Sequence, residues 1–181
     1  MASEDLRSVK QDTVPLTNLR SFKQKVRHNR RRFRLFLAKL ENNPPKNLTE
    51  MAIAADKQTW IETDCLSCAN CCKTMTPTFT PADIKRISAH LDMTPHAFRK
   101  KWLHKDKGDW TNIKQPCQFL NLTDNKCSIY EVRPSDCSGF PHHDKKKTTD
   151  YVHVYKQNVE YCPATYKWVE KMMALAKNME I

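Results

Sequence analysis

Four cysteines within eight residues constrain this chain more than any other part of its sequence. They are followed by four more, so the complete series is Cys65, Cys68, Cys71, Cys72, Cys117, Cys127, Cys137 and Cys162. Thiolates are soft ligands that suit zinc, copper(I) and iron-sulfur clusters, and two-residue spacers let consecutive thiolates surround one centre. The pattern predicts a metal-binding domain that uses up to eight cysteines.

The same cysteine count would also allow four disulfide bonds, so the cellular compartment matters. The first residues include Glu4 and Asp5 and no apolar segment of a secretory signal follows them. No apolar run approaches the roughly 18 residues of a membrane span. We therefore expect a cytoplasmic protein without a membrane partner, in which thiols stay reduced and clustering favours metal binding.

The order of the cysteines suggests one grouping into two sets of four. Neighbouring side chains diverge, so Cys71 and Cys72 are poor ligands for the same small ion. A ferredoxin-like run with a distant Cys-Pro would join Cys65, Cys68, Cys71 and Cys162. The second set would then be Cys72, Cys117, Cys127 and Cys137. Spacing does not fix long-range connectivity, so other groupings stay open.

Two kinds of cofactor suit such thiolate sets. Zinc favours closed tetrahedral sites with a structural role, and paired CxxC units are typical of it. The run with two-residue spacers and the Cys-Pro partner favours a [4Fe-4S] cluster, which transfers electrons or acts as a Lewis acid. We expect an iron-sulfur cluster, with zinc as the alternative. Tyr130 and Arg133 lie between two expected ligands, so we predict that they contact the cofactor's sulfurs.

Positive charge is concentrated at the start of the chain. The net charge is +11, and residues 1–58 hold 13 Lys and Arg against 6 Asp and Glu. Between residues 16 and 40, apolar residues recur at helical spacing, and Lys and Arg occupy the opposite face. Asn42 to Pro45 should end this helix, because proline cannot continue its hydrogen bonds.

We therefore divide the chain into residues 1–58, a loose arm to about residue 16 and an amphipathic helix, and residues 59–181, the cysteine-cluster domain. The simplest interpretation of the helix is that its apolar face packs on the cysteine domain and its basic face is solvated. Alternatively, Arg30–Arg34 bind an anionic macromolecule such as a nucleic acid or an acidic protein.

The remaining sequence predicts short elements around the cysteines. Helix starts are expected at Thr80, with Pro81 and Asp83 behind it, and at Thr94. A turn at Pro134 should begin a short helix that carries Cys137. Extended structure is expected at residues 60–64, in a hairpin over residues 115–130 and in a strand over residues 151–155. A final helix should run from Pro163 to about Met179, with Trp168, Met172, Leu175 and Met179 on its apolar side.

These elements predict an α+β fold: a small, mostly helical, cysteine-rich domain with short β-hairpins, preceded by a long basic N-terminal helix. His142 and His143 are expected in a solvated loop, and His153 partly buried on a strand. No Ser-His-Asp order and no HExxH zinc helix occur, so the sequence leaves open whether the protein is an enzyme.

The ordered cysteine motifs resemble one known family. After the first four cysteines come Cys117-Gln-Phe-Leu, Cys127-Ser-Ile-Tyr, Arg133-Pro134 before Cys137, and Phe140-Pro141. Over residues 60–170 the chain resembles the CxxCxxCC cysteine-cluster family of zinc- or iron-chelating domains. A flagellin lysine methylase shares this type of motif, so the resemblance implies protein-modifying activity. The family often has arginine after the cysteine that matches Cys137, where this chain has Ser138.

Two functions follow from these observations. The first is a metal-binding protein that holds an iron-sulfur cluster or zinc and has redox or modifying activity. The alternative is a structural zinc module that binds a nucleic acid or a protein partner through its basic helix. A third interpretation, metal delivery, would require exchangeable metal.

Overall fold

The computed structural model describes residues 17–145 and 147–177. The expected arm before residue 17 and Met179 lie outside this range. The chain divides into two compact units, the first formed by residues 1–68 and 141–181 and the second by residues 69–140. The expected α+β class, mostly helical with a small antiparallel sheet and a long N-terminal helix, is confirmed. The expected domain division at residue 58 stays a prediction.

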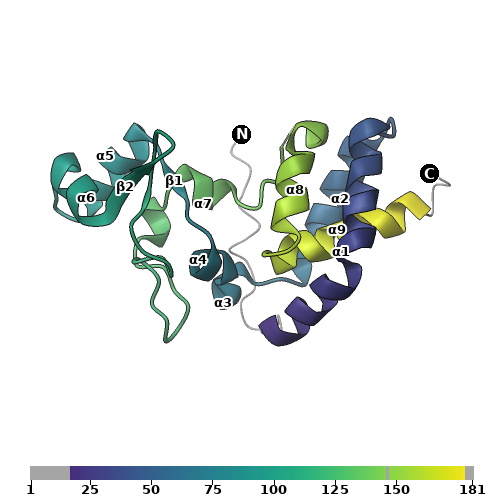
Figure 1. The fold of residues 1–181 in the computed structure, drawn as a ribbon, viewed down its shortest axis with the longest axis horizontal. Coiled ribbons are helices and arrows are strands. Elements are labelled where there is room, and N and C mark those ends of the chain that lie inside the picture. The colour runs from purple at the N-terminus through teal and green to yellow at the C-terminus, as the bar shows by residue number, and fades with distance from the viewer. Residues whose placement is uncertain (1–16, 146, 178–181) are drawn as a thin grey trace. The chain divides into compact units, whose positions relative to one another are not determined.

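In the described part of the first unit the structure is helical (Figure 1). Its helices are α1 (Leu19–Asn42), α2 (Leu48–Ile61), α3 (Cys65–Cys68), the 3-10 turn η2 (Thr148–Tyr151), α8 (Val152–Asn158) and α9 (Pro163–Lys177). Helix α1 begins where the Asn18 side chain accepts a hydrogen bond from the Ser21 amide, and it stops before Pro44 as expected. Its buried residues recur at three, four and seven: Phe22, Val26, Phe33, Leu37 and Leu40.

The core of this unit lies between α1, α2, α8 and α9. Trp168 and Met172 on α9 are fully buried, as expected for its apolar face, and Leu175 is partly buried against them. The Trp168 indole donates a hydrogen bond of 3.0 Å to the carbonyl of Ala52 on α2. This contact satisfies the polar end of a large buried side chain and fixes α9 against α2.

Helix α2 was not predicted from the sequence. Because it includes residues 60 and 61, the expected extended segment at residues 60–64 is wrong. Trp60 and Ile61 complete the helix, and the Trp60 indole donates to the carboxylate of Asp56 one turn earlier, at 2.8 Å. Two of the buried residues of α2, Ala52 and Ala55, are small, and they give hydrophobic periodicity little signal there.

The strand expected over residues 151–155 is also wrong. Val152, Tyr155 and Val159 are buried at spacings of three and four, which is a helical stripe and forms α8. Five residues are too few to distinguish the alternation of a strand from the periodicity of a helix. His153 is exposed on this helix, contrary to the expectation of partial burial.

The second unit surrounds a three-stranded antiparallel sheet of order β1-β3-β2, with β1 (Thr78–Phe79), β2 (Leu103–Asp106) and β3 (Asp109–Asn112). Its helical segments are α4 (Asn70–Thr74), α5 (Pro81–His90), α6 (Pro95–Trp102), the 3-10 turn η1 (Tyr130–Val132) and α7 (Ser135–Gly139). Thr80 and Thr94 cap α5 and α6 as expected. The core gathers Phe79, Ile84, Ile87, Phe98, Leu103, Phe119 and Ile129.

The hairpin of β2 and β3 was not predicted. These strands join through Lys107 and Gly108, both with positive φ, as a two-residue hairpin turn requires. Residues 115–130, where a hairpin was expected, hold an antiparallel bridge between Leu120 and Cys127. The amide of Asn121 donates to the carbonyl of Lys126 and that of Ser128 to the carbonyl of Phe119, both at 2.8 Å, so the two arms pair there without forming strands. In the described residues no helix is both long and apolar enough to cross a membrane.

Two leucines on α1 test this packing. Leu37 is fully buried and Leu35 is 62% exposed. We expect Leu37→Ala to lower the free energy of unfolding by about 2 to 5 kcal/mol, because it leaves a cavity in the core. Leu35→Ala should change it by less than about 0.5 kcal/mol. Urea denaturation followed by circular dichroism measures both, and equal effects would contradict the assignment of the buried face.

Candidate metal centre

None of the eight cysteines, all of them within the described residues, forms a disulfide bond, and they divide between the two units. Cys65, Cys68 and Cys162 belong to the first unit. The second unit holds Cys71, Cys72, Cys117, Cys127 and Cys137. Each unit therefore presents its own set of soft sulfur donors.

Backbone hydrogen bonds bring together three of the segments that carry cysteines in the second unit. The amide of Cys117 donates to the carbonyl of Cys72 at 2.8 Å, which places α4 beside the segment after the sheet. The amide of Leu120 donates to the carbonyl of Cys117 at 3.0 Å, and Leu120 pairs with Cys127. Cys72, Cys117 and Cys127 are thus linked through main-chain contacts.

Electrostatic interactions link the thiols of Cys72, Cys117, Cys127 and Cys137. Burial raises the pKa of Cys117, Cys127 and Cys137, with Cys127 at about 11, and the charge of Cys72 raises the pKa of all three further. Cys117 also raises the pKa of Cys127 and Cys137, and Cys127 raises that of Cys137. Ionising Cys117, Cys127 and Cys137 beside a charged Cys72 is therefore unfavourable, and a bound cation would offset this cost.

Cys72 differs from the other three. A hydrogen bond from the Cys71 thiol, with the sulfurs 3.9 Å apart, is the main cause that lowers its pKa to about 7, and Lys73 contributes to the same shift. Burial opposes the shift without cancelling it. Cys72 is therefore the most readily ionised member of the second-unit set.

Hydrogen-bond donors act on the Cys117 and Cys127 sulfurs. The Asn112 side chain, almost fully buried, donates to the Cys117 sulfur at 3.3 Å and is itself held by Gln118 at 2.8 Å. Backbone amides of Phe119 and Leu120 also lower the pKa of Cys117, and that of Ile129 lowers the pKa of Cys127. Sequence analysis missed Asn112, because a polar residue at the end of a short strand carries no metal-site signal.

Arg133 and Tyr130 lie together at this site. The Arg133 guanidinium stacks 3.9 Å from the centre of the Tyr130 ring and donates to the Tyr130 carbonyl at 2.8 Å. Its positive charge lowers the pKa of Cys127. Arg133 thus acts on this thiol through its charge, and Tyr130 holds the guanidinium in place.

The described residues contain no group of three or more Cys, His, Asp or Glu side chains already arranged to hold a metal ion. Cys72, Cys117, Cys127 and Cys137, four of the five cysteines of the second unit, interact electrostatically without being closed around a centre. Their chemistry, four soft sulfurs of which those of Cys117 and Cys127 have hydrogen-bond donors, fits zinc or an iron-sulfur cluster. The assignment of individual ligands stays a prediction.

In the first unit, Cys68 and Cys162 are buried and Cys65 is exposed. Burial is the main cause that raises the pKa of Cys162 to about 11, and the charge of Cys68 adds to it. The Thr165 amide donates to the Cys162 sulfur at 3.5 Å. Cys71 belongs to the other unit, so the expected set of Cys65, Cys68, Cys71 and Cys162 stays a prediction.

His143 corrects the expectation of a solvated loop at residues 142–143. It is 2% exposed and stacks 4.7 Å from Trp168. Its Nδ1 lies 3.0 Å from the Asp56 carboxylate and its Nε2 lies 3.1 Å from the Thr165 hydroxyl. Both ring nitrogens have protein partners, so His143 is a buried structural residue beside Cys162.

Comparison with known proteins agrees with this cysteine arrangement. The CxxCxxCC family, described as a "Putative zinc- or iron-chelating domain", matches residues 64–163. The chain belongs to this family. An uncharacterized protein of Methanocaldococcus jannaschii is 32% identical over 76 residues, which are 40% of this chain and 41% of that protein. The chain therefore matches about two fifths of that relative's length. No solved structure matches.

The neighbouring thiols of this CxxCxxCC domain offer a pH test. In reduced, metal-free protein, Cys72 should become reactive as pH rises through about 7, because its thiolate forms there. Cys71→Ala should move this point upward, towards the ordinary thiol value of about 8.5, by removing the hydrogen bond. Iodoacetamide alkylation at several pH values, resolved by peptide mass spectrometry, measures it.

Cys65→Ala is the matched control, because Cys65 is not among the causes of the Cys72 shift. An unchanged alkylation profile for Cys72 in the Cys71 variant would show that this hydrogen bond does not set its ionisation.

Proposed function

We propose that this protein binds a metal centre in its second unit through Cys72, Cys117, Cys127 and Cys137. The observation that supports it is that main-chain contacts link the segments of Cys72, Cys117 and Cys127, while the charge of Cys72 raises the pKa of Cys117, Cys127 and Cys137. Burying several like charges without a counter-charge is costly, so thiolates collected in this way call for a cation among them. Membership of a zinc- or iron-chelating family agrees with this requirement.

We favour an iron-sulfur cluster and a redox role. The hydrogen-bond donors to the sulfurs are the Asn112 amide and the main-chain amides at residues 119, 120 and 129. The positive charge of Arg133 also acts on the Cys127 sulfur. Hydrogen bonds to sulfur and nearby charge are features through which proteins set a cluster's reduction potential. A bound cluster would supply one-electron transfer. The contacts described act on the sulfurs, which supports redox chemistry over modification of a substrate.

We assign the three cysteines of the first unit, Cys65, Cys68 and Cys162, to a second centre. Cys71 stays a predicted metal ligand. We place the protein in the cytoplasm, because thiolates that bind metal persist in a reducing compartment.

Metal content tests the two proposed sets. Protein purified without oxygen should contain iron and acid-labile sulfide and show the broad visible absorption of a cluster. Cys137→Ser should lose the metal of one set and Cys65→Ser that of the other, so the double variant should lose both. Elemental analysis and absorption spectra measure this. Zinc without sulfide would replace the redox role by a structural one, and full metal in the Cys137 variant would refute the ligand set.

A second candidate function rests on the basic face of α1. Arg27, Arg30, Arg31 and Arg34 line a shallow groove with Leu35. Arg30 and Arg34 both contact the Glu160 carboxylate, at 2.9 and 3.0 Å, which neutralises part of the charge and holds both guanidinium groups. Held guanidinium groups match phosphate geometry, so this groove favours binding of nucleic acid.

Charge reversal tests this candidate. We expect wild-type protein to bind a fluorescent RNA or DNA oligonucleotide with affinity that falls steeply as salt rises. Arg27→Glu/Arg31→Glu should weaken binding by at least roughly tenfold, because it removes phosphate contacts. Lys85→Glu/Lys100→Glu changes the net charge equally and places both substitutions in the second unit. Equal losses in both variants, or no binding at low salt, would eliminate the groove as the site.

A further inference from the structure

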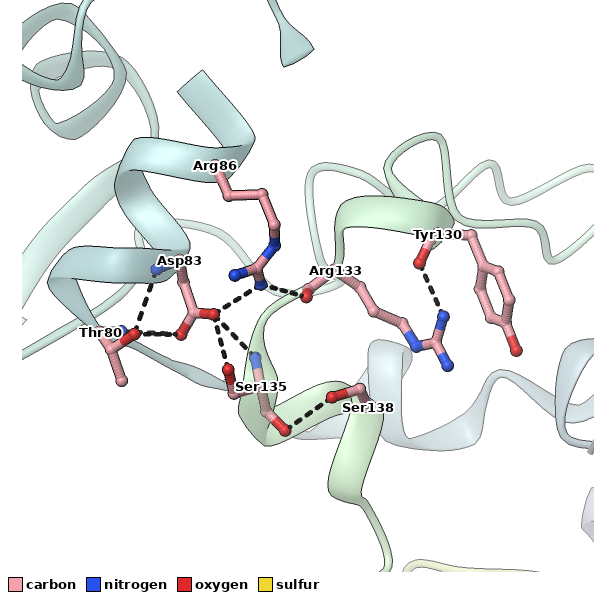
Figure 2. Close-up of polar contacts among 7 residues, drawn as sticks. All are labelled: Thr80, Asp83, Arg86, Tyr130, Arg133, Ser135 and Ser138. Atoms are coloured by element: carbon pink, nitrogen blue, oxygen red, sulfur yellow. Dashed lines mark hydrogen bonds and ion pairs between the residues drawn. The ribbon is translucent and has the colours of Figure 1, made fainter. Parts of the chain in front are cut away.

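Asp83 is fully buried at the start of α5 and accepts hydrogen bonds from three residues (Figure 2). One carboxylate oxygen accepts from the Thr80 amide and hydroxyl, at 3.0 and 2.7 Å. The other accepts from Arg86 at 2.6 Å and from the Ser135 amide and hydroxyl, at 3.1 and 2.8 Å. Ser135 lies 52 residues further along the chain.

Asp83 accepts more hydrogen bonds than capping the N-terminus of α5 requires. A capping box requires only the exchange between Thr80 and Asp83. Burial alone would raise the pKa of Asp83, but the hydrogen bonds from Thr80, Arg86 and Ser135 hold it far below its ordinary value, so the carboxylate stays charged. A buried charge needs several strong donors, and here two of them come from the segment around Pro134.

Arg86 contacts the backbone on the other side of Pro134. The same Arg86 nitrogen that contacts Asp83 donates to the carbonyl of Arg133 at 2.9 Å, and Figure 2 shows both contacts. Asp83 and Arg86 therefore hold the backbone at Arg133 and at Ser135. We call these two side chains the α5 clamp.

The clamped turn carries two groups of the candidate metal centre. Ser135 is the first residue of α7, on which Cys137 follows two residues later. The Arg133 side chain points the other way, to Tyr130, and its charge reaches Cys127. The Thr78 amide also donates to Asp136 at 3.0 Å, which ties α7 to the start of β1. The position of Cys137 thus depends on Asp83, Arg86 and Thr78, which are not among the proposed ligands.

We propose that Asp83 is a positioning residue of the metal centre: through Ser135 and Arg86 it places Cys137 and Arg133 for metal binding. This inference rests on the proposed function, because it takes Cys137 as a ligand. Residues that orient metal ligands from outside the coordination sphere commonly contribute as much as 10- to 100-fold in metal affinity.

Cobalt binding tests the clamp, because thiolate-to-cobalt absorption reports both affinity and the number of bound thiolates. Apo protein is titrated with Co²⁺ against a competing chelator under reducing conditions. We expect Asp83→Asn, which is nearly isosteric but uncharged, to weaken Co²⁺ binding roughly 10- to 100-fold and to reduce the thiolate-to-cobalt absorption at saturation. The lower absorption would report that Cys137 no longer joins the other sulfurs.

Thr94→Ala is the matched control. It removes the capping hydrogen bond of α6 in the same unit, between Thr94 and the Ala97 amide, and should lower the melting temperature without changing Co²⁺ affinity or spectrum. Ser135→Ala removes one hydroxyl donor and should weaken Co²⁺ binding roughly five- to tenfold. If Asp83→Asn does not fold, this variant decides alone.

The outcomes separate the two proposals. Wild-type affinity and spectrum in both Asp83→Asn and Ser135→Ala, with Cys137→Ser impaired, would overturn the clamp and leave the metal centre intact. Wild-type affinity and spectrum in Cys137→Ser would overturn the proposed ligand set itself. Equal losses of Co²⁺ affinity in Thr94→Ala and Asp83→Asn would show a general effect of stability and would also refute the clamp.

Discussion

The cost of ionising four partly buried thiols near one another is the constraint on which the proposed centre in the second unit depends. Its sheet and helices bring together segments that carry Cys72, Cys117, Cys127 and Cys137, and three of these thiols resist ionisation because of burial and of one another's charge. Metal binding requires deprotonated thiolates, so folding and metal binding are coupled in such a site. The donors from Asn112 and the main chain stabilise negative sulfur and lower this cost.

Buried polar networks hold cysteine-bearing segments in both units. In the second unit, Asp83 and Arg86 fix the turn before Cys137. In the first unit, Asp56 and Thr165 hold His143 between them, and the Thr165 amide contacts the Cys162 sulfur. Each network joins segments far apart in sequence, and fully satisfied networks of this kind favour a single arrangement of the segments that they join.

Local signals in the sequence predicted several elements correctly. The caps at Thr80 and Thr94, the prolines after α1 and the helical stripe of α1 each depend on residues a few positions apart. The cysteine motifs identified the family for the same reason. Predictions failed where short patterns are ambiguous, as in the five alternating residues that form part of η2 and α8. They also failed where small alanines are buried in α2.

Contacts between residues far apart in the chain could not be predicted from the sequence. The burial of His143 depends on Asp56 and Trp168, which lie far from it in the chain. Asp83 was recognised as a helix cap, but its second partner, Ser135, could not be inferred from spacing. The grouping of Cys72 with Cys117, Cys127 and Cys137 comes from motif order and stays a prediction; burial and the charges of the other three thiols raise the pKa of Cys137.

The most direct test of the central claim is the metal content of a protein that retains the four proposed ligands of the second unit. The variant Cys65→Ser/Cys68→Ser/Cys162→Ser leaves them intact, and it can be purified without oxygen and analysed for iron, zinc and acid-labile sulfide. If Cys72, Cys117, Cys127 and Cys137 form one centre, the folded variant retains tightly bound metal. A folded variant without metal would contradict the account.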